Sequence, residues 1–197
     1  NNTLIVSGYY AEEGNKDNVA IGFYLTQIDF NNGSVKSQQL KDLGLELSQS
    51  LRSEVKAQNN IVNLKTKGLR HLKVKEYFST SDGGGYFVSS VNYKHDLSID
   101  IHGHILVTKF DGNGTVEWMK KVKQFSWAEG VKNNRLGYIT HFNHKKEEIN
   151  IILNDGPNTN EALNLISFDP LGVKTITQLY KEAERKQFNL VFFPSNH

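Results

Sequence analysis

The sequence predicts an all-β protein built from four-stranded antiparallel units that resemble the blades of a propeller. Short runs rich in β-branched and aromatic residues alternate with turns containing Gly, Asn and Asp. One pattern, a strand that ends in an aliphatic or aromatic residue plus Asp and is followed by a Gly turn, occurs three times. Another all-β sandwich or barrel, or an α+β fold, remains as an alternative, because sandwiches also contain Gly hairpins at this spacing.

The repeat covers pairs of neighbouring strands. Its three Asp-ending strands are residues 22–29, 104–111 and 162–169. A strand of similar composition precedes each of them, at residues 4–10, 86–93 and 149–155. Earlier lead-in strands at residues 69–78 and 135–143 complete the second and third copies, whereas the first copy lacks one. Four strands per copy is the pattern of a propeller blade.

The expected organisation is one repeat domain over residues 1–197, with units of about 1–40, 69–124 and 135–180. Leucines recur at spacings of three and four over residues 41–58, which predicts an inserted amphipathic helix. The apolar residues 188–193 predict one more strand, the lead-in of a further unit. We therefore expect the chain to be incomplete as a closed propeller, and to self-associate or to pack on a partner.

Composition excludes several classes of protein. The chain of 197 residues has 38% hydrophobic and 22% charged residues, which is ordinary for a globular protein. Its net charge of +2 is too small for a nucleic-acid binder. No apolar run reaches the roughly 18 residues of a membrane span. The absence of Cys excludes disulfides, thiolate metal sites and Cys nucleophiles.

Two segments are candidate metal sites. His102 and His104 lie two residues apart, on one face of a predicted strand that follows a polar loop over residues 94–103. Asp111 and Asn113 supply oxygens at alternate positions, as in a calcium loop. The competing interpretations are a surface loop for the histidines and a hairpin turn for the Asp-Gly segment. No cofactor is expected, with calcium as the one metal to consider.

Four aromatic residues are candidates for a surface that stacks on sugars. They are Trp127, in a predicted loop, together with Tyr93, Tyr9 and Tyr10. No catalytic motif accompanies them. The glycines at 83–85 lack the Lys-Ser/Thr ending of a phosphate loop, and no Gly-x-Ser-x-Gly elbow is present. The sequence therefore assigns no catalytic residue.

Three strings carry a resemblance to a known group of proteins: residues 81–88 (SDGGGYFV), 105–111 (ILVTKFD) and 114–118 (GTVEW). They resemble the β-propeller-like repeats of uncharacterised bacterial envelope or secreted proteins. The third unit departs from that pattern, because it lacks the Gly-rich turn and the Trp, and the first unit lacks the Trp. The resemblance implies a propeller-like fold and an extracellular or cell-envelope location, and it carries no catalytic residues.

Two functions follow as hypotheses. The first is a non-enzymatic binding or structural module that presents loops to a protein or glycan partner. The alternative is a carbohydrate-active hydrolase whose acidic residues come from separate blades and meet at the axis. A cavity lined by paired carboxylates with perturbed pKa values would favour the hydrolase.

Overall fold

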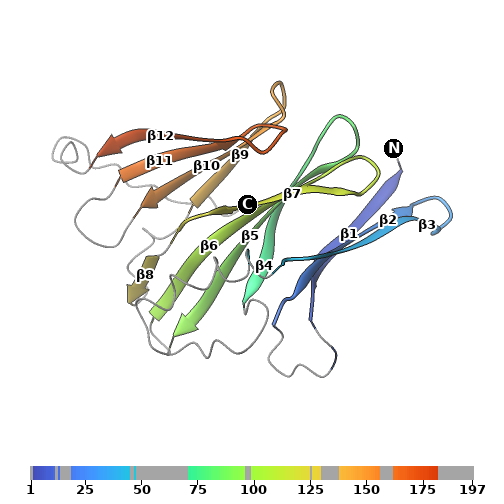
Figure 1. The fold of residues 1–197 in the computed structure, drawn as a ribbon, viewed down its shortest axis with the longest axis horizontal. Helices are drawn as coiled ribbons and strands as arrows, with labels where there is room; N and C mark the ends of the chain where they lie inside the picture. Colours follow the sequence, from blue (N-terminus) through green and yellow to red (C-terminus); the bar gives the residue numbers. More distant parts are fainter. Residues whose placement is uncertain are drawn as a thin grey trace. The chain divides into compact units, whose positions relative to one another are not determined.

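The computed structural model describes residues 2–11, 13, 19–44, 47, 71–95, 99–124, 126–129, 138–155 and 162–181. Every element in this part of the chain is a β-strand, and the strands form three antiparallel sheets (Figure 1). The prediction of an all-β protein is confirmed. Among these residues, no helical segment has the length and apolar character that crossing a bilayer requires.

The first sheet contains β1 (Thr3–Tyr10), β2 (Gly22–Asp29) and β3 (Val35–Asp42), with β2 in the middle. β1 and β2 pair along their whole length, with Leu4 opposite Ile28 and Tyr10 opposite Gly22. β3 pairs with the other edge of β2 and contains one register shift near Ile28. This is the unit that the sequence predicts to lack its lead-in strand.

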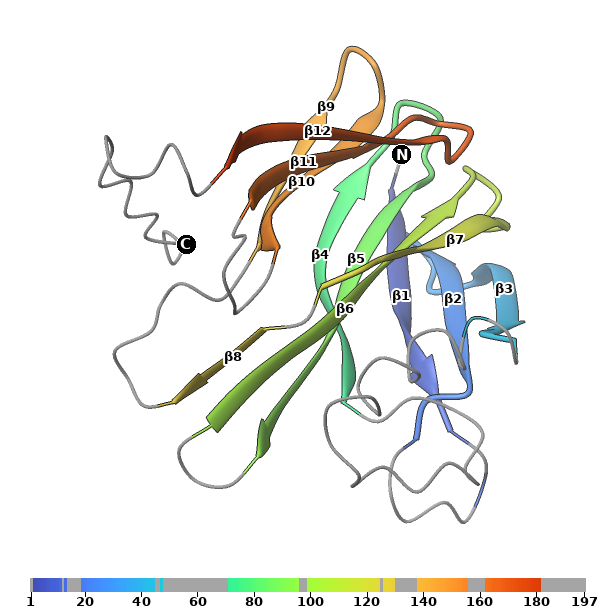
Figure 2. The same cartoon turned by 60° about the vertical axis from the view of Figure 1, so that its left-hand side comes forward.

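The second sheet has the order β4-β5-β6-β7. Its strands are β4 (Leu72–Ser79), β5 (Gly85–His95), β6 (Ile99–Phe110) and β7 (Val116–Val122). A short strand, β8 (Ser126–Glu129), pairs with the beginning of the long β6 (Figure 2). The four consecutive strands are the expected content of one unit, whereas β8 is an addition that the repeat does not predict.

The third sheet has the order β12-β11-β10-β9. It contains β9 (Tyr138–Asn143), β10 (Glu148–Asp155), β11 (Ala162–Phe168) and β12 (Lys174–Lys181). Alternate residues of the central strands are buried, as a half-buried sheet requires. The buried side chains are Phe142, Ile149, Ile151, Leu153, Ile166 and Phe168.

The chain divides into two compact units, residues 1–91 with 104–121, and residues 92–103 with 122–197. Within the former, the first and second sheets pack face to face. Their shared core consists of Phe23, Leu25, Phe87, Phe110 and Val116, with Ile5, Tyr9, Val74 and Met119 at its margin. The rings of Phe23 and Phe87 are 5.4 Å apart, so aromatic contacts join the two sheets.

The start of the predicted helix over residues 41–58 is wrong. Lys41 and Asp42 are the last residues of β3 and lie opposite Phe23 and Gly22 of β2. The next residue continues this pairing, because the Leu43 amide donates to the Ile21 carbonyl at 3.0 Å. Backbone pairing with β2 therefore overrides the helical spacing of the leucines at this point. Of the remaining predicted helix, Leu47 is helical, Leu43 and Gly44 are not, and the rest lies outside the described residues.

The predicted loops around the second sheet are also corrected. Residues 94–103 were expected to form a loop, but β5 extends to His95 and β6 begins at Ile99. Trp127 lies in β8 and not in a loop, since its backbone pairs with Ile101. The polar composition of these segments does not indicate strands. They form strands because their backbone groups hydrogen-bond to a neighbouring strand. The predicted tail strand at residues 188–193 lies outside the described residues.

Candidate functional site: the turns and the outer face of the first sheet

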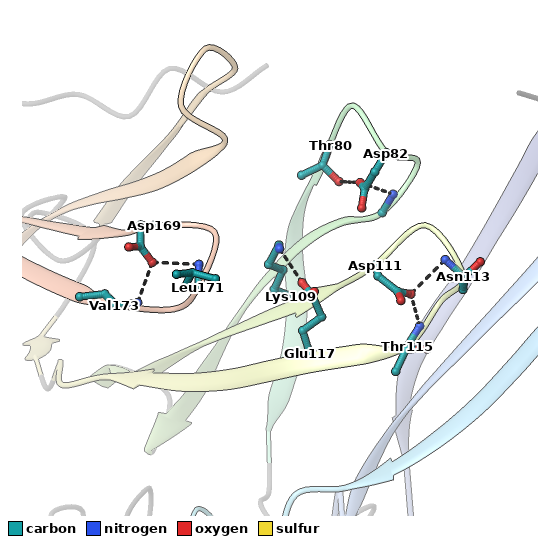
Figure 3. Close-up of polar contacts among 11 residues, drawn as sticks. Thr80, Asp82, Lys109, Asp111, Asn113, Thr115, Glu117, Asp169, Leu171 and Val173 are labelled. Carbon is teal, nitrogen blue, oxygen red and sulfur yellow. Dashed lines mark hydrogen bonds and ion pairs between the residues drawn. The ribbon is translucent and has the colours of Figure 1, made fainter.

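The turn between β6 and β7 shows how each repeated Asp-Gly segment is built. The Asp111 carboxylate accepts the amides of Asn113 and Thr115 at 2.9 and 2.7 Å (Figure 3). The Gly114 amide donates to the Asp111 carbonyl, and Gly114 has a φ of +83°, which favours glycine. The Asp111 side chain therefore accepts hydrogen bonds from amides within the turn, as in an Asx turn.

The other two repeats use related turns. Asp169, between β11 and β12, accepts the amides of Leu171 and Val173 at 2.9 and 2.8 Å (Figure 3). Asp29, between β2 and β3, accepts the Asn31 amide at 2.9 Å, and its second carboxylate oxygen lies 3.2 Å from Lys36 Nζ. These carboxylates have the same structural role in each repeat. Their oxygens accept hydrogen bonds from turn amides or pair with a neighbouring lysine.

The turn between β4 and β5 builds the same backbone shape from different residues. The Thr80 hydroxyl donates to Asp82 at 2.6 Å, and the Gly84 amide donates to the same oxygen at 3.0 Å (Figure 3). The Thr80 hydrogen bond, followed by that of the Gly84 amide, holds the pKa of the Asp82 carboxyl below its usual value, although partial burial opposes this.

Asp29 and Asp82 are poor candidates for general acids. The Asn31 amide and then the Lys36 ammonium lower the pKa of the Asp29 carboxyl, and the pKa of Asp82 is lowered as well. A general acid needs the opposite shift, towards a carboxyl that keeps its proton near neutral pH. A further carboxylate, that of Glu117, forms an ion pair at 2.5 Å with Lys109, which is largely buried (Figure 3).

The residues suggested as metal ligands have separate structural settings. His102 and His104 both lie in β6, and His104 is 1% exposed. Asp111 is seven residues beyond His104, which in a strand amounts to about 23 Å, so these two side chains cannot share one ion. Asn113 is exposed, and its amide binds Asp111. In the described part of the chain, no three His, Asp or Glu side chains form a metal-binding group.

The four aromatic residues suggested as a sugar-binding surface lie on three different strands, β1, β5 and β8. Tyr9 and Tyr10 are neighbours on β1 and therefore point to opposite faces of the first sheet. The Tyr9 ring packs edge-on against Phe23, with ring centres 5.6 Å apart, and its hydroxyl donates to Ser89 Oγ at 2.7 Å. Tyr93 and Trp127 belong to the other compact unit, in β5 and β8. Sugar binding by these four residues stays a prediction.

The first sheet has a second apolar side, opposite the side that packs on the second sheet. Strand alternation and cross-strand register place seven apolar or aromatic side chains there, with Thr26 and Gln38 between them. We call them the outer face: Leu4, Val6, Tyr10, Tyr24, Ile28, Val35 and Leu40. Four of them are exposed, with 47% for Leu4, 38% for Val6, 60% for Val35 and 67% for Leu40.

Two tyrosines of the outer face lie across glycines of the neighbouring strand. A Cβ atom at Gly8 would be 2.9 Å from the Tyr24 ring, and one at Gly22 would overlap the Tyr10 ring. Each ring therefore covers the backbone where the opposite residue has no side chain, which is a known way to strengthen a strand pair. The Tyr10 hydroxyl also donates to the Asp42 carboxylate. The outer face is thus an ordered surface.

Charged and polar side chains lie at both ends of the first sheet. Asp29 and Lys36 form an ion pair at one end, where Lys36 also donates to Thr3 at 3.1 Å. At the other end of β3, Asp42 lies opposite Gly22 on the outer side, whereas Lys41 lies opposite Phe23 and therefore on the inner side. An apolar centre with a polar border is the usual anatomy of a protein interface.

The outer face was not predicted from the sequence, although a signal for it exists. Leu4, Ile5 and Val6 are consecutive apolar residues, so both sides of β1 are apolar. Such a run is typical of a strand that is covered on both sides. In the described part of the molecule, Ile5 is covered by the second sheet, whereas Leu4 and Val6 remain exposed.

Comparisons of the chain with protein-family models, with curated proteins and with solved structures found no match.

Proposed function

We propose that this protein is a non-enzymatic binding or structural module, built from propeller-like sheets, that docks a protein partner on the outer face of its first sheet. The observation that carries the proposal is the exposure of Leu4, Val6, Val35 and Leu40 together on one ordered sheet face. Contiguous apolar surface of this kind marks interaction sites on soluble proteins.

Further observations support a module that binds and does not catalyse. The carboxylates of the repeated turns hold backbone amides, and the pKa values of Asp29 and Asp82 are lowered. No described group favours the carbohydrate-active hydrolase, which stays a prediction together with the glycan partner. The stacking of the first sheet on the second supports propeller-like packing. An envelope or extracellular location is part of the proposal and rests on the resemblance of the repeats.

Site-specific photo-crosslinking in the cells that make this protein tests the proposal. A photoreactive amino acid replaces Leu40, which is 67% exposed on the outer side of β3. We expect a covalent adduct of one defined mass. The matched control carries the same amino acid at Ile139 of β9, an exposed strand position outside the first sheet. If neither position gives an adduct, or if both give the same mixture, the outer face is not a docking surface.

A further inference from the structure

The two Asn-Gly dipeptides of the chain, at residues 32–33 and 113–114, both lie in hairpin turns. From the contacts of these turns we infer that Asn32 is a site of spontaneous deamidation in the folded protein, because the Ser34 amide activates its side chain, whereas Asn113 is protected. The inference concerns a covalent modification and does not depend on the proposed function. Three observations carry it: the length of each turn, the hydrogen bond to the Asn side chain and the packing of the Gly.

The reaction joins the side chain of an Asn to the backbone of the next residue. The backbone nitrogen of that residue attacks Cγ of the Asn, its proton passes through solvent to the side-chain nitrogen, and the Cγ–Nδ2 bond breaks. Ammonia leaves and a cyclic imide remains. Water then adds to one of the two imide carbonyls and opens the ring to aspartate or isoaspartate. A following Gly favours the cyclisation, since it has no Cβ to hinder the attacking nitrogen.

The turn between β2 and β3 is one residue longer than the turn between β6 and β7. The Gly33 amide donates to the carbonyl of Asp29, four residues earlier, at 2.8 Å. The Gly114 amide donates to the carbonyl of Asp111, three residues earlier, at 2.9 Å. Each Gly amide loses one backbone hydrogen bond when it reacts, so this cost is similar at the two sites. The extra residue instead changes the partner of the next amide along the chain.

The amide that follows each Gly binds a different side chain in the two turns. In the shorter turn, the Thr115 amide donates to the Asp111 carboxylate at 2.7 Å. In the longer turn, the Ser34 amide donates to Asn32 Oδ1 at 2.8 Å. This Asx turn folds the Asn32 side chain over the Gly33 peptide and holds Cγ beside the nitrogen that attacks it. The Ser34 amide also stabilises the negative charge that develops on Oδ1, as a donor of an oxyanion hole does.

The two glycines also differ in the space around them. No heavy atom lies within 4 Å of a Cβ atom added to Gly33. Although the Asn113 side chain is exposed, Gly114 is buried, and a Cβ atom added there would lie 2.8 Å from Ser37 Oγ and 2.9 Å from Leu25 Cδ2. The longer turn can therefore rearrange into the imide ring in open solvent. Ring closure at Gly114 would have to move the turn against the first sheet.

The products change the hairpin that carries one edge of the outer face. Deamidation adds a negative charge to the turn that contains Asp29, the ion-pair partner of Lys36. Isoaspartate also lengthens the backbone of the turn by one carbon atom, shortly before Val35 begins β3. Because ammonia is lost, the change is irreversible and accumulates with the age of the protein.

Peptide mapping by mass spectrometry tests the inference with the purified full chain. The chain is aged at physiological temperature and mildly alkaline pH, and the exchange of ammonia for water is followed at Asn32 and Asn113, which lie in different tryptic peptides. We expect Asn32 to react at least about tenfold faster than Asn113. The same chain in concentrated urea is the matched control, since both dipeptides should then react at similar rates. Similar rates in the folded chain, or no reaction at Asn32, overturn the inference.

A variant tests the hydrogen bond itself. Ser34→Pro removes the N–H that donates to Asn32 Oδ1. The rate at Asn32 should fall by about threefold to tenfold, whereas the rate at Asn113 should stay the same. Asn113 also reports the fold, because its rate rises if the variant unfolds, and the comparison in the unmodified chain then decides. An unchanged rate at Asn32 in a folded variant overturns the inference, since the Ser34 amide would have no part in the reaction.

Discussion

The two faces of the first sheet are made by alternate residues of the same three strands, yet they differ sharply in exposure. Phe23 and Leu25 on the inner face are fully buried, whereas Leu40 on the outer face is 67% exposed. Both faces contain aliphatic and aromatic side chains in register. The difference therefore comes from what covers each face and not from composition, because the second sheet covers only the inner one. This contrast is what supports the proposal of a partner on the outer face.

The largest effect is expected from truncating each face in turn. Phe23→Ala removes a ring that contacts Tyr9 and Phe87 and should lower the free energy of unfolding by about 3 to 5 kcal/mol. Leu40→Ala on the outer face should change it by less than about 1 kcal/mol in the dilute protein. Urea unfolding followed by circular dichroism measures both. Similar losses for the two variants would show that the outer face is buried within one chain.

Two turn glycines allow the covered and the uncovered parts of the first sheet to be compared by substitution. Gly114 faces the inner side, where an added Cβ would lie 2.8 Å from Ser37 Oγ and 2.9 Å from Leu25 Cδ2. Gly33 has a similar φ of +72°, but no heavy atom lies within 4 Å of its added Cβ. Both Ala substitutions cost about 1 to 2 kcal/mol of backbone strain. Gly114→Ala should cost about 1 to 3 kcal/mol more, because it also overpacks the contact between the sheets.

The same urea titration compares the two glycine variants, with Gly33→Ala as the control for strain alone. Equal destabilisation would mean that the β6–β7 turn moves away from the first sheet without cost. That result would also question the bonds that join them, such as the Gln27 side-chain amide donating to the Gly112 carbonyl at 3.2 Å.

Much of the fold follows from local patterns in the sequence. Strands such as β2 and β10 are runs of β-branched and aromatic residues, and the Asp-Gly turns that follow the repeat are local hydrogen-bonded structures. The three strands of the first sheet, against four consecutive strands in the second and third, are also visible as a pattern in the sequence. These features depend on residues that are close along the chain, so the sequence is sufficient to find them.

Other features depend on distant pairing and were missed. β8 exists because its backbone bonds to Ile99–His102 of β6, and no hydrophobic pattern marks it. Lys41 and Asp42 are in a strand because β2 lies beside them, although the leucine spacing there predicts a helix. The outer face was missed for a similar reason. Apolar residues on both sides of β1 predict that both sides are covered. They do not indicate whether the covering residues come from the same chain or from a partner.

The smallest effect concerns two neighbouring tyrosines on opposite faces. Burial between the sheets raises the pKa of Tyr9 above its usual value. On the outer face, burial and then the hydrogen bond to the Asp42 carboxylate raise the pKa of Tyr10 from 10.0 to about 12. In the unfolded chain both phenols ionise near pH 10. The folded chain therefore holds more protons, and the free energy of unfolding should fall as the pH rises from about 10 towards about 12.

Absorbance of the phenolate band and urea unfolding across this pH range measure the effect. Tyr10→Phe removes the part of the pH dependence that comes from the outer face, and Tyr9→Phe removes the part from the inner face. Tyr10→Phe should make the decline shallower while leaving stability near pH 7 almost unchanged, because the exposed border of a sheet gains little from one hydrogen bond. Tyr9→Phe should also lower stability at pH 7, since Ser89 then loses its buried partner. If the two variants behave alike at pH 7, the two faces are equally covered, and the contrast drawn between them is wrong.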